Sequence, residues 1–377
     1  MTDRDHDKWM STCLDLAKHG AGRVSPNPMV GAVLVGTDGT LLGQGEHREF
    51  GGAHAEVHAV QDAERRYGED ALANATLYVN LEPCSHHGKT PPCVDLILQK
   101  RIPRVILGAA DPHPEVAGKG IRRLRDGGVD VTEGVMESAC RRLNEAYIHH
   151  VQTGRPLVTL KMAQTLDARV AGVSGRSQWI SGEASRRLVH HWRATTDGVL
   201  VGTNTALRDD PSLTVRHVEG RHPTRIVLDR TGRLPGDLHL FTDEHADHTV
   251  VVADETTELP YEEALTGRGG RVLRTKSSSG ALDLPHALAC LGRNAGPEDR
   301  PLQSILVEGG GKVAASLLTG DLVDRLFLFI APRLLGAGPL SVDGIGRQDL
   351  NEALDFVEYE WEPIDEDMLF RGFRRSF

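Results

Sequence analysis

The sequence has 377 residues, which is too many for one ordinary hydrophobic core, so we expect two domains. Hydrophobic residues make up 39% and charged residues 25% of the chain, as in soluble globular proteins, and the net charge of -10 argues against a general nucleic-acid binder. No apolar run reaches the about 18 residues of a membrane span, and residues 1–20 lack the apolar centre of a signal peptide, so we expect a cytoplasmic protein.

Residues 1–145 alternate between helical and extended patterns. An amphipathic helix is expected within residues 1–20, and the apolar segments 30–35 and 41–45 flank a turn, which predicts a hairpin. Further strands are expected at residues 75–79, 104–108 and 129–131, and helices at 55–66, 93–100 and 120–126. Strands that alternate with helices predict an α/β sandwich with a largely parallel sheet.

A domain boundary is expected near residues 145–157, where a helical pattern ends in Thr153-Gly154-Arg155-Pro156 and a strand follows. We place the two domains at residues 1–148 and 149–377. Strands of the second domain are expected at residues 157–162, 198–201, 225–228, 249–252, 304–307 and 325–330. Helical patterns lie between several of them, which predicts a second α/β domain.

The clearest chemical pattern joins one histidine to two of the five cysteines. The motif HAE starts at His54, and a Pro-Cys pair with a second cysteine follows one strand later, at Cys84 and Cys93. This is the arrangement of zinc deaminases, in which one imidazole and two thiolates hold the metal and leave a fourth position open. We therefore expect His54, Cys84 and Cys93 to bind one Zn²⁺ per chain, with Glu56 as general base and acid.

Other interpretations of these residues are weaker. A disulfide between Cys84 and Cys93 conflicts with the expected compartment, and the remaining alternative is that each cysteine is a small buried residue. His58, one turn after His54, is expected to be structural because a fourth protein ligand would close the site. His87 is expected to lie on the surface.

Longer stretches of the sequence resemble the bifunctional deaminase/reductase family of riboflavin biosynthesis. They are GGAHAEVHAV from Gly51, YVNLEPCSHHGKTPPC from Tyr78, SPNPMVG from Ser25, SQWI from Ser177, NTALRDDPSLTVR from Asn204 and VEGGG from Val307. The resemblance covers nearly the whole chain. It implies a cytidine-deaminase-like α/β/α sandwich followed by a dihydrofolate-reductase-like α/β domain.

The same resemblance implies two reactions on small phosphorylated pyrimidines. Zinc-dependent hydrolysis removes the 2-amino group of 2,5-diamino-6-ribosylamino-4(3H)-pyrimidinone 5′-phosphate. NADPH then reduces the ribosyl chain of 5-amino-6-(5-phosphoribosylamino)uracil to ribityl. In the deaminase half, the family positions that hold base, ribose and phosphate are matched by Asn27, His47, His86 and Lys89, and the compact cation of Lys89 suits a phosphate.

In the reductase half, the resemblance implies two groups of contacts. The residues that contact NADPH are Ala163, Trp179, Thr205, Asp209, Gly310 and Gly311, with Arg230 a candidate for the 2′-phosphate or a solvated side chain. The residues that contact substrate are Lys161, Ser177, Arg193, Leu213, Arg216 and Glu308. Among these, Lys161 and Glu308 are candidates for proton delivery, whereas the two arginines suit the phosphate.

One position departs from the family pattern. After the first reductase strand the family usually reads Ser/Thr-Leu-Asp-Gly, whereas this chain reads Thr165-Leu166-Asp167-Ala168. If that position needs a positive φ, alanine strains the turn, and the cofactor contacts expected of Ala163 and Gln164 change with it.

Two other functions were weighed against the two-step enzyme. A deaminase of nucleic-acid bases is disfavoured by the acidic balance, by the phosphate-binding loop and by the second domain. A non-catalytic metal-stabilised scaffold or nucleotide sensor is disfavoured by Glu56, which a structural zinc site does not need. We expect a homo-oligomer, with no nucleic-acid or membrane partner.

Overall fold

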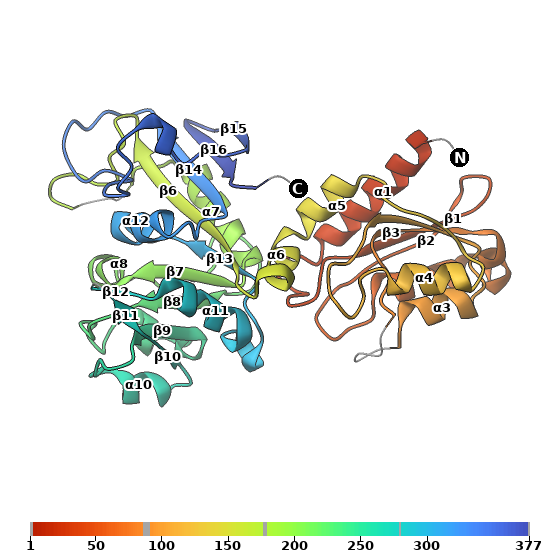
Figure 1. The fold of residues 1–377 in the computed structure, drawn as a ribbon, viewed down its shortest axis with the longest axis horizontal. Coiled ribbons are helices and arrows are strands. Elements are labelled where there is room, and N and C mark those ends of the chain that lie inside the picture. The colour runs from red at the N-terminus through yellow and green to blue at the C-terminus, as the bar shows by residue number, and fades with distance from the viewer. Residues whose placement is uncertain (1–2, 86–90, 176–178, 279, 376–377) are drawn as a thin grey trace. The chain divides into compact units, whose positions relative to one another are not determined.

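The computed structural model describes residues 3–85, 91–175, 179–278 and 280–375. The chain divides into two compact units, one that ends at Thr153 and one that begins at Gly154 (Figure 1). The boundary expected after residue 148 falls within helix α6 (Glu145–Thr153). No helix in the described ranges is long and apolar enough to cross a membrane.

The first unit is built on a five-stranded sheet of order β2-β1-β3-β4-β5. The two antiparallel pairings join β1 (Gly31–Val35) to β2 (Leu41–Glu46) and to β3 (Thr76–Leu81). The two parallel pairings join β3 to β4 (Arg104–Ala109) and β4 to β5 (Asp130–Thr132). The sheet is therefore mixed, and the expectation of a largely parallel sheet was wrong, because the N-terminal hairpin supplies half of the pairings.

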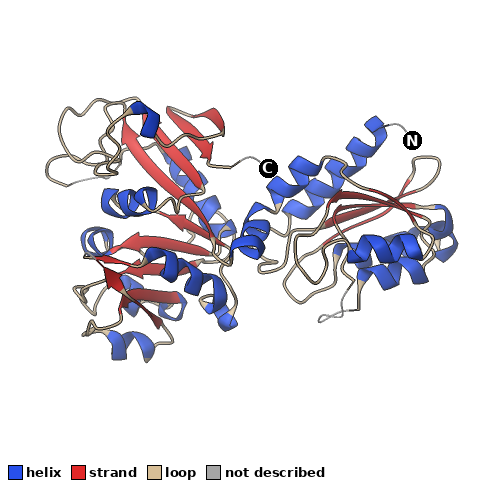
Figure 2. Ribbon diagram, viewed as in Figure 1, coloured by secondary structure: helices blue, strands red, loops and turns tan. Residues whose placement is uncertain are grey.

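Helices cover both faces of this sheet (Figure 2). One face packs against α2 (Ala55–Tyr67), α3 (Cys93–Gln99) and α4 (Lys119–Asp126), whereas the other packs against α1 (Asp3–Lys18) and α5 (Glu137–Leu143). All five residues of β1 and all six of β3 are buried, and β1 is accordingly a continuous apolar run, whereas β3 also buries Thr76 and Asn80. The unit is the expected α/β/α sandwich.

The second unit is built on a nine-stranded sheet of order β10-β9-β8-β7-β13-β6-β14-β16-β15. Its parallel strands are β6 (Leu157–Thr165), β7 (Gly198–Gly202), β8 (Thr224–Leu228), β9 (Thr249–Asp254), β10 (Arg271–Thr275), β13 (Ser304–Val307) and β14 (Arg325–Ala331). An antiparallel hairpin at one edge consists of β15 (Glu358–Ile364) and β16 (Asp367–Phe373). A small ribbon is formed by β11 (Ser277–Ser278) and β12 (Ala281–Leu282).

Helices also cover both faces of the second sheet. One face packs against α11 (Leu284–Asn294) and α12 (Gly311–Thr319). The opposite face packs against α7 (Glu183–Thr195), α8 (Thr203–Asp209), α9 (His239–Thr242) and α10 (Glu262–Thr266). Single 3₁₀ turns lie at Glu69–Asn74, Ala246–His248, Pro297–Asp299 and Leu350–Glu352.

Candidate active sites

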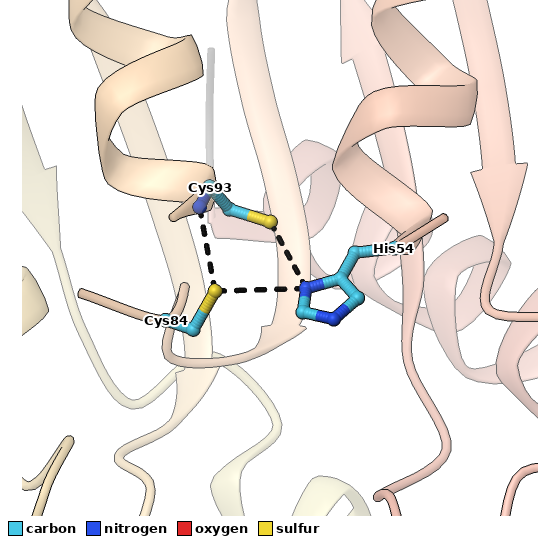
Figure 3. Close-up of side chains that lie close together, drawn as sticks. All are labelled: His54, Cys84 and Cys93. Carbon is cyan, nitrogen blue, oxygen red and sulfur yellow. Dashed lines mark hydrogen bonds between the residues drawn. The ribbon is translucent and has the colours of Figure 1, made fainter. Parts of the chain in front are cut away.

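Three side chains of the first unit converge on one point (Figure 3). The Nδ1 atom of His54 lies 3.2 Å from the Sγ atom of Cys93 and 3.6 Å from that of Cys84. All three ligand atoms lie within 4.8 Å of one another. One imidazole nitrogen and two thiols form a donor set that suits zinc, and three protein ligands leave a position for water. The residues present therefore fit the metal that the sequence implies.

Each of the three residues is placed by the start or end of an element. His54 precedes α2 with extended backbone angles, as expected for a side chain that turns back toward the helix start. Cys84 follows β3, and Cys93 is the first residue of α3. The backbone N–H of Cys93 donates to Cys84 Sγ at 3.3 Å, and the hydrogen bonds from Cys93 and His54 lower the pKa of the Cys84 thiol.

Glu56 lies beside this group, in the first turn of α2, and its side chain is buried. Burial raises the pKa of its carboxyl group, the Cys84 charge adds to that rise, and His54 opposes it. A carboxyl group whose pKa is raised toward neutrality can accept and return a proton, which is the chemistry that a deaminase needs. His58 is turned away, since its Nδ1 atom bonds the carbonyl oxygen of Glu46 at 2.8 Å.

Asn27 and His47 lie next to the metal ligands. The Nδ1 atom of His47 donates to the carbonyl oxygen of Ala53 at 3.0 Å, and its Nε2 atom is 3.0 Å from Asn27 Nδ2. The imidazole of His47 also meets that of His54 edge-on, with ring centroids 5.4 Å apart. The structure thus brings together two of the four expected substrate contacts of this half. The other two, His86 and Lys89, fall outside the described residues.

Glu82, which sequence reasoning missed, supports the strand end that carries Cys84. Its buried carboxylate accepts four backbone N–H groups, from Asp111 and Gly118 at Oε2 and from Gly120 and Ile121 at Oε1, at 3.0 to 3.3 Å. The acidic residue beside Pro83-Cys84 was the available signal. Its partners lie about 30 to 40 residues later in the chain, so no local pattern reveals them.

In the second unit, four expected substrate residues form a charged cluster. Arg193 in α7 donates from Nε and Nη2 to the two carboxylate oxygens of Glu308 at 2.6 and 3.0 Å. Burial lowers the pKa of Lys161 in β6, although Glu308 opposes the shift. Burial favours the neutral form of Glu308, but Arg193, together with Lys161 and His190, outweighs that effect and lowers its pKa. Arg216 lies close enough for the charges of Arg193 and Glu308 to act on its pKa.

His190 is a second residue that sequence reasoning missed. It lies one turn before Arg193 in α7 and is buried, and its Nδ1 atom accepts the backbone N–H of Arg216 at 3.2 Å. Helical spacing from Arg193 was the available signal.

Leu213, an expected substrate contact, is buried and has a positive φ of 54°.

Three of the expected cofactor residues, Gly310, Gly311 and Thr205, lie around the start of α12. Gly310 immediately precedes this helix, and a Cβ atom there would lie 3.6 Å from Thr205 Oγ1 of α8. A Cβ atom on Gly311 would lie 3.4 Å from the carbonyl oxygen of Leu340. Both distances are ordinary van der Waals contacts, so a side chain would fit at either position, and what suits a phosphate here is the set of free N–H groups at the helix start beside Thr205.

The remaining expected cofactor residues are more scattered. Asp209 ends α8, Ala163 lies in β6, and Trp179 is exposed. Arg230 is exposed and follows β8, and its carbonyl oxygen accepts from Thr257 Oγ1 at 2.8 Å. Ser177 falls outside the described residues.

The turn after β6 has the geometry that disfavours alanine. Ala168 has a φ of 60°, so the position does adopt the left-handed conformation in which glycine is unstrained. The turn is held in place by Asp167, which accepts the backbone N–H groups of Leu335 and Gly336 at 3.0 and 2.7 Å. The carbonyl oxygen of Ala168 accepts from Ser341 N at 2.9 Å.

Comparisons with known proteins agree with this two-part arrangement. A family model described as RibD C-terminal domain matches residues 156–370, and one described as cytidine and deoxycytidylate deaminase zinc-binding region matches residues 3–109. The riboflavin biosynthesis proteins RibD of Actinobacillus pleuropneumoniae and Aquifex aeolicus are 38% and 39% identical to the chain, over 98% and 97% of its length and 94% and 98% of theirs.

A solved structure from Thermotoga maritima has the same fold throughout. It is described as a diaminohydroxyphosphoribosylaminopyrimidine deaminase/5-amino-6-(5-phosphoribosylamino)uracil reductase. Its TM-score is 0.85 at 38% identity, and the match covers 98% of this chain and 99% of that one. The chain therefore belongs to the RibD family of riboflavin biosynthesis, with a zinc-binding deaminase domain and a reductase domain in one polypeptide.

Proposed function

We propose that this bifunctional deaminase and reductase acts on the two substrates named for the family. It would deaminate 2,5-diamino-6-ribosylamino-4(3H)-pyrimidinone 5′-phosphate with one zinc ion per chain. It would then reduce the ribosyl chain of 5-amino-6-(5-phosphoribosylamino)uracil with NADPH. The observation that carries the proposal is the convergence of His54, Cys84 and Cys93 beside the buried carboxyl group of Glu56.

In the first reaction, His54, Cys84 and Cys93 would hold the zinc ion, which would supply Lewis acidity to the site. Glu56 would take a proton from the attacking water as the water oxygen bonds to C2 of the pyrimidinone, and would pass the proton to a ring nitrogen. Glu56 then carries a second proton to the amine, which leaves as ammonia while C2 becomes a carbonyl. Asn27, His47, His86 and Lys89 are the residues expected to hold the base, ribose and phosphate, with Lys89 suited to the phosphate.

In the second reaction, the reductase unit would bind NADPH, which would supply the hydride that C1′ of the opened ribosylamino chain accepts. A proton must reach the adjacent nitrogen to complete the amine. Lys161 is the better donor of the two candidates, because burial lowers the pKa of its ammonium group. Glu308 is kept ionised by its two hydrogen bonds from Arg193. It therefore orients the Arg193 guanidinium group and does not serve as the proton donor.

The test is to incubate the full-length, zinc-loaded enzyme with the diaminopyrimidine substrate, with and without NADPH, while ammonia and NADPH absorbance are followed. We expect ammonia in both cases and NADPH oxidation that begins only after ammonia release. Absence of ammonia from enzyme that carries one zinc per chain would contradict the substrate assignment.

The choice of NADPH over NADH is tested separately with Arg230→Ala. If Arg230 binds the 2′-phosphate, the KM for NADPH should rise by about tenfold, while the KM for NADH stays unchanged. Equal changes for both cofactors would place Arg230 outside the phosphate site.

A further inference from the structure

Residues 212–216 form no strand, and side chains of other elements bind their backbone instead. The carbonyl oxygen of Ser212 accepts from Arg225 Nη1 at 3.2 Å, and that of Thr214 accepts from Arg193 Nη1 at 3.1 Å. Between these two carbonyl groups, Leu213 has a positive φ of 54°. Side chains from helix α7 and strand β8 therefore hold this segment in a conformation that a leucine rarely adopts.

The next two backbone N–H groups of the segment are bound by histidines. Val215 donates to Nδ1 of His222 at 3.1 Å, and Arg216 donates to Nδ1 of His190 at 3.2 Å. An imidazole nitrogen that accepts a hydrogen bond carries no proton, so the His190 ring is neutral and its hydrogen lies on Nε2. Its ring also meets that of His217 edge-on, with centroids 4.6 Å apart.

The two arginines of the cluster differ in their exposure and in their hydrogen-bond partners. Arg193 uses Nε and Nη2 on Glu308 and Nη1 on Thr214, and only 11% of its side chain is exposed. Arg216 is exposed, and its Nη1 atom donates to Ser212 Oγ at 2.7 Å. Of these two guanidinium groups, that of Arg216 is therefore the one available to a substrate phosphate.

We propose that His190 is a positioning residue of the reductase: by accepting the backbone N–H of Arg216, it fixes the point from which the Arg216 guanidinium reaches the substrate phosphate. The inference rests on the proposed function, because it takes the phosphorylated uracil as substrate. It assigns a positioning role to a buried histidine of α7.

The test compares His190→Asn with His190→Leu in the full-length enzyme. Asparagine and leucine have similar size and shape, but only asparagine places an acceptor atom where Nδ1 of the imidazole lies. His191→Leu, at the exposed next position of α7, serves as the control for helix substitution. Reductase kinetics are measured with the phosphorylated uracil and with the same compound after phosphatase treatment.

We expect His190→Leu to raise the KM for the phosphorylated uracil by about tenfold, the equivalent of about 1.4 kcal/mol. Its kcat, its KM for NADPH and its kinetics with the dephosphorylated compound should stay within about twofold of wild type, since only uniform substrate binding is lost. His190→Asn should restore the wild-type KM, and His191→Leu should behave as wild type.

Two outcomes would overturn the proposal. A fall in kcat and a rise in the KM for NADPH of similar size in His190→Leu would show a general structural role. Equal defects in the Asn and Leu variants would show that the hydrogen bond is not what matters. If the Leu variant does not fold, His190→Gln replaces it, because the glutamine oxygen lies one bond too far to reach Arg216 N.

Arg216→Ala separates this inference from the proposed function. If wild type and Arg216→Ala treat the phosphorylated and dephosphorylated compounds alike, the phosphate assignment itself is wrong. If Arg216→Ala loses the preference for phosphate but His190→Leu keeps it, only the positioning role of His190 is wrong.

Discussion

Arg193 and Glu308 form a bidentate ion pair, with Nε to Oε1 at 2.6 Å and Nη2 to Oε2 at 3.0 Å, and both side chains are only 11% exposed. Removal of the arginine alone would leave a carboxylate with little access to water. We therefore expect Arg193→Met to lower the free energy of unfolding of the second unit by about 3 kcal/mol. Urea denaturation measures this change.

The double variant Arg193→Met/Glu308→Gln provides the control for this prediction. It removes both charges, so it should lose less stability than the two single variants summed. Strict additivity in that cycle would mean that the two side chains do not stabilise each other. All three variants should keep the ammonia-releasing activity of the first unit.

Glu56→Gln tests proton transfer in the deaminase. Glutamine has the same shape as glutamate but cannot accept a proton from water, so ammonia release should fall by about 10²- to 10⁴-fold. Zinc content, measured by atomic absorption, should remain that of the wild type, and reduction of the deaminated product should continue. Ammonia release at the wild-type rate would remove Glu56 from the mechanism.

Glu82→Gln tests whether the buried carboxylate supports the metal site. The amide keeps one oxygen acceptor and turns an NH₂ group toward backbone donors, so the first unit should lose about 2–3 kcal/mol of stability. Zinc should also be lost to a chelator at a lower concentration than from wild type. Glu115→Gln, at an exposed position of the segment that donates N–H groups to Glu82, should change neither property. Unchanged zinc retention in Glu82→Gln would limit its role to folding.

Ala168→Gly tests the strained turn after β6. Alanine at a φ of 60° is disfavoured by about 1–2 kcal/mol, and glycine removes that strain. Glycine also makes the unfolded chain more flexible, which costs about 0.4–1 kcal/mol of stability. We therefore expect a net gain in stability of about 0.5–1 kcal/mol. Chemical denaturation should show Ala168→Val destabilised and the neighbouring Ala171→Gly without any gain. A less stable Ala168→Gly would mean that the alanine methyl group makes a contact worth more than the strain.

His190 should give the second unit a specific pH dependence. Burial lowers its pKa from 6.5 to about 4, the charges of Arg193, His217 and Arg216 add to the shift, and Glu308 opposes it. The unfolded imidazole binds a proton near pH 6.5, whereas the folded one does not until about pH 4. Stability from this group is therefore complete above pH 6.5 and declines as the pH falls toward 4.

The measurement is urea denaturation of wild type and His190→Asn across that pH window. Because asparagine does not titrate, the variant should lose less stability than wild type between pH 6.5 and 4. Parallel curves would show that His190 takes up its proton equally in both states.

Local patterns predicted the convergence of His54, Cys84 and Cys93 more completely than the reductase cluster. The HAE motif and the two Pro-Cys pairs identify His54, Cys84 and Cys93 because each of these residues lies at a helix start or after a strand end, where the local sequence determines its position. The hydrogen bond from Arg216 to His190 joins residues 26 positions apart, one in an irregular segment and one in a helix, so no periodic sequence pattern predicts it. The four N–H donors to Glu82 were hidden for the same reason.

The fold was also only partly predictable. The strands of both sheets with continuous apolar runs were anticipated, but the edge hairpin β15–β16 was not. Its first strand, EYEWEPI, alternates glutamates with exposed aromatic residues such as Tyr359 and Trp361, so it lacks the apolar run of a buried strand. Its position follows from pairing with β14, which is a long-range relationship.

The presence of both sets of site residues in one polypeptide has a consequence for the cell. The described residues expected to serve the deaminase all come from the unit that ends at Thr153, and those expected to serve the reductase all come from the unit that begins at Gly154. Translation of one message therefore produces the two catalytic centres in a fixed one-to-one ratio, whatever the level of expression. Any imbalance between production and consumption of the shared intermediate must then arise from the turnover rates of the two centres, and not from their relative abundance.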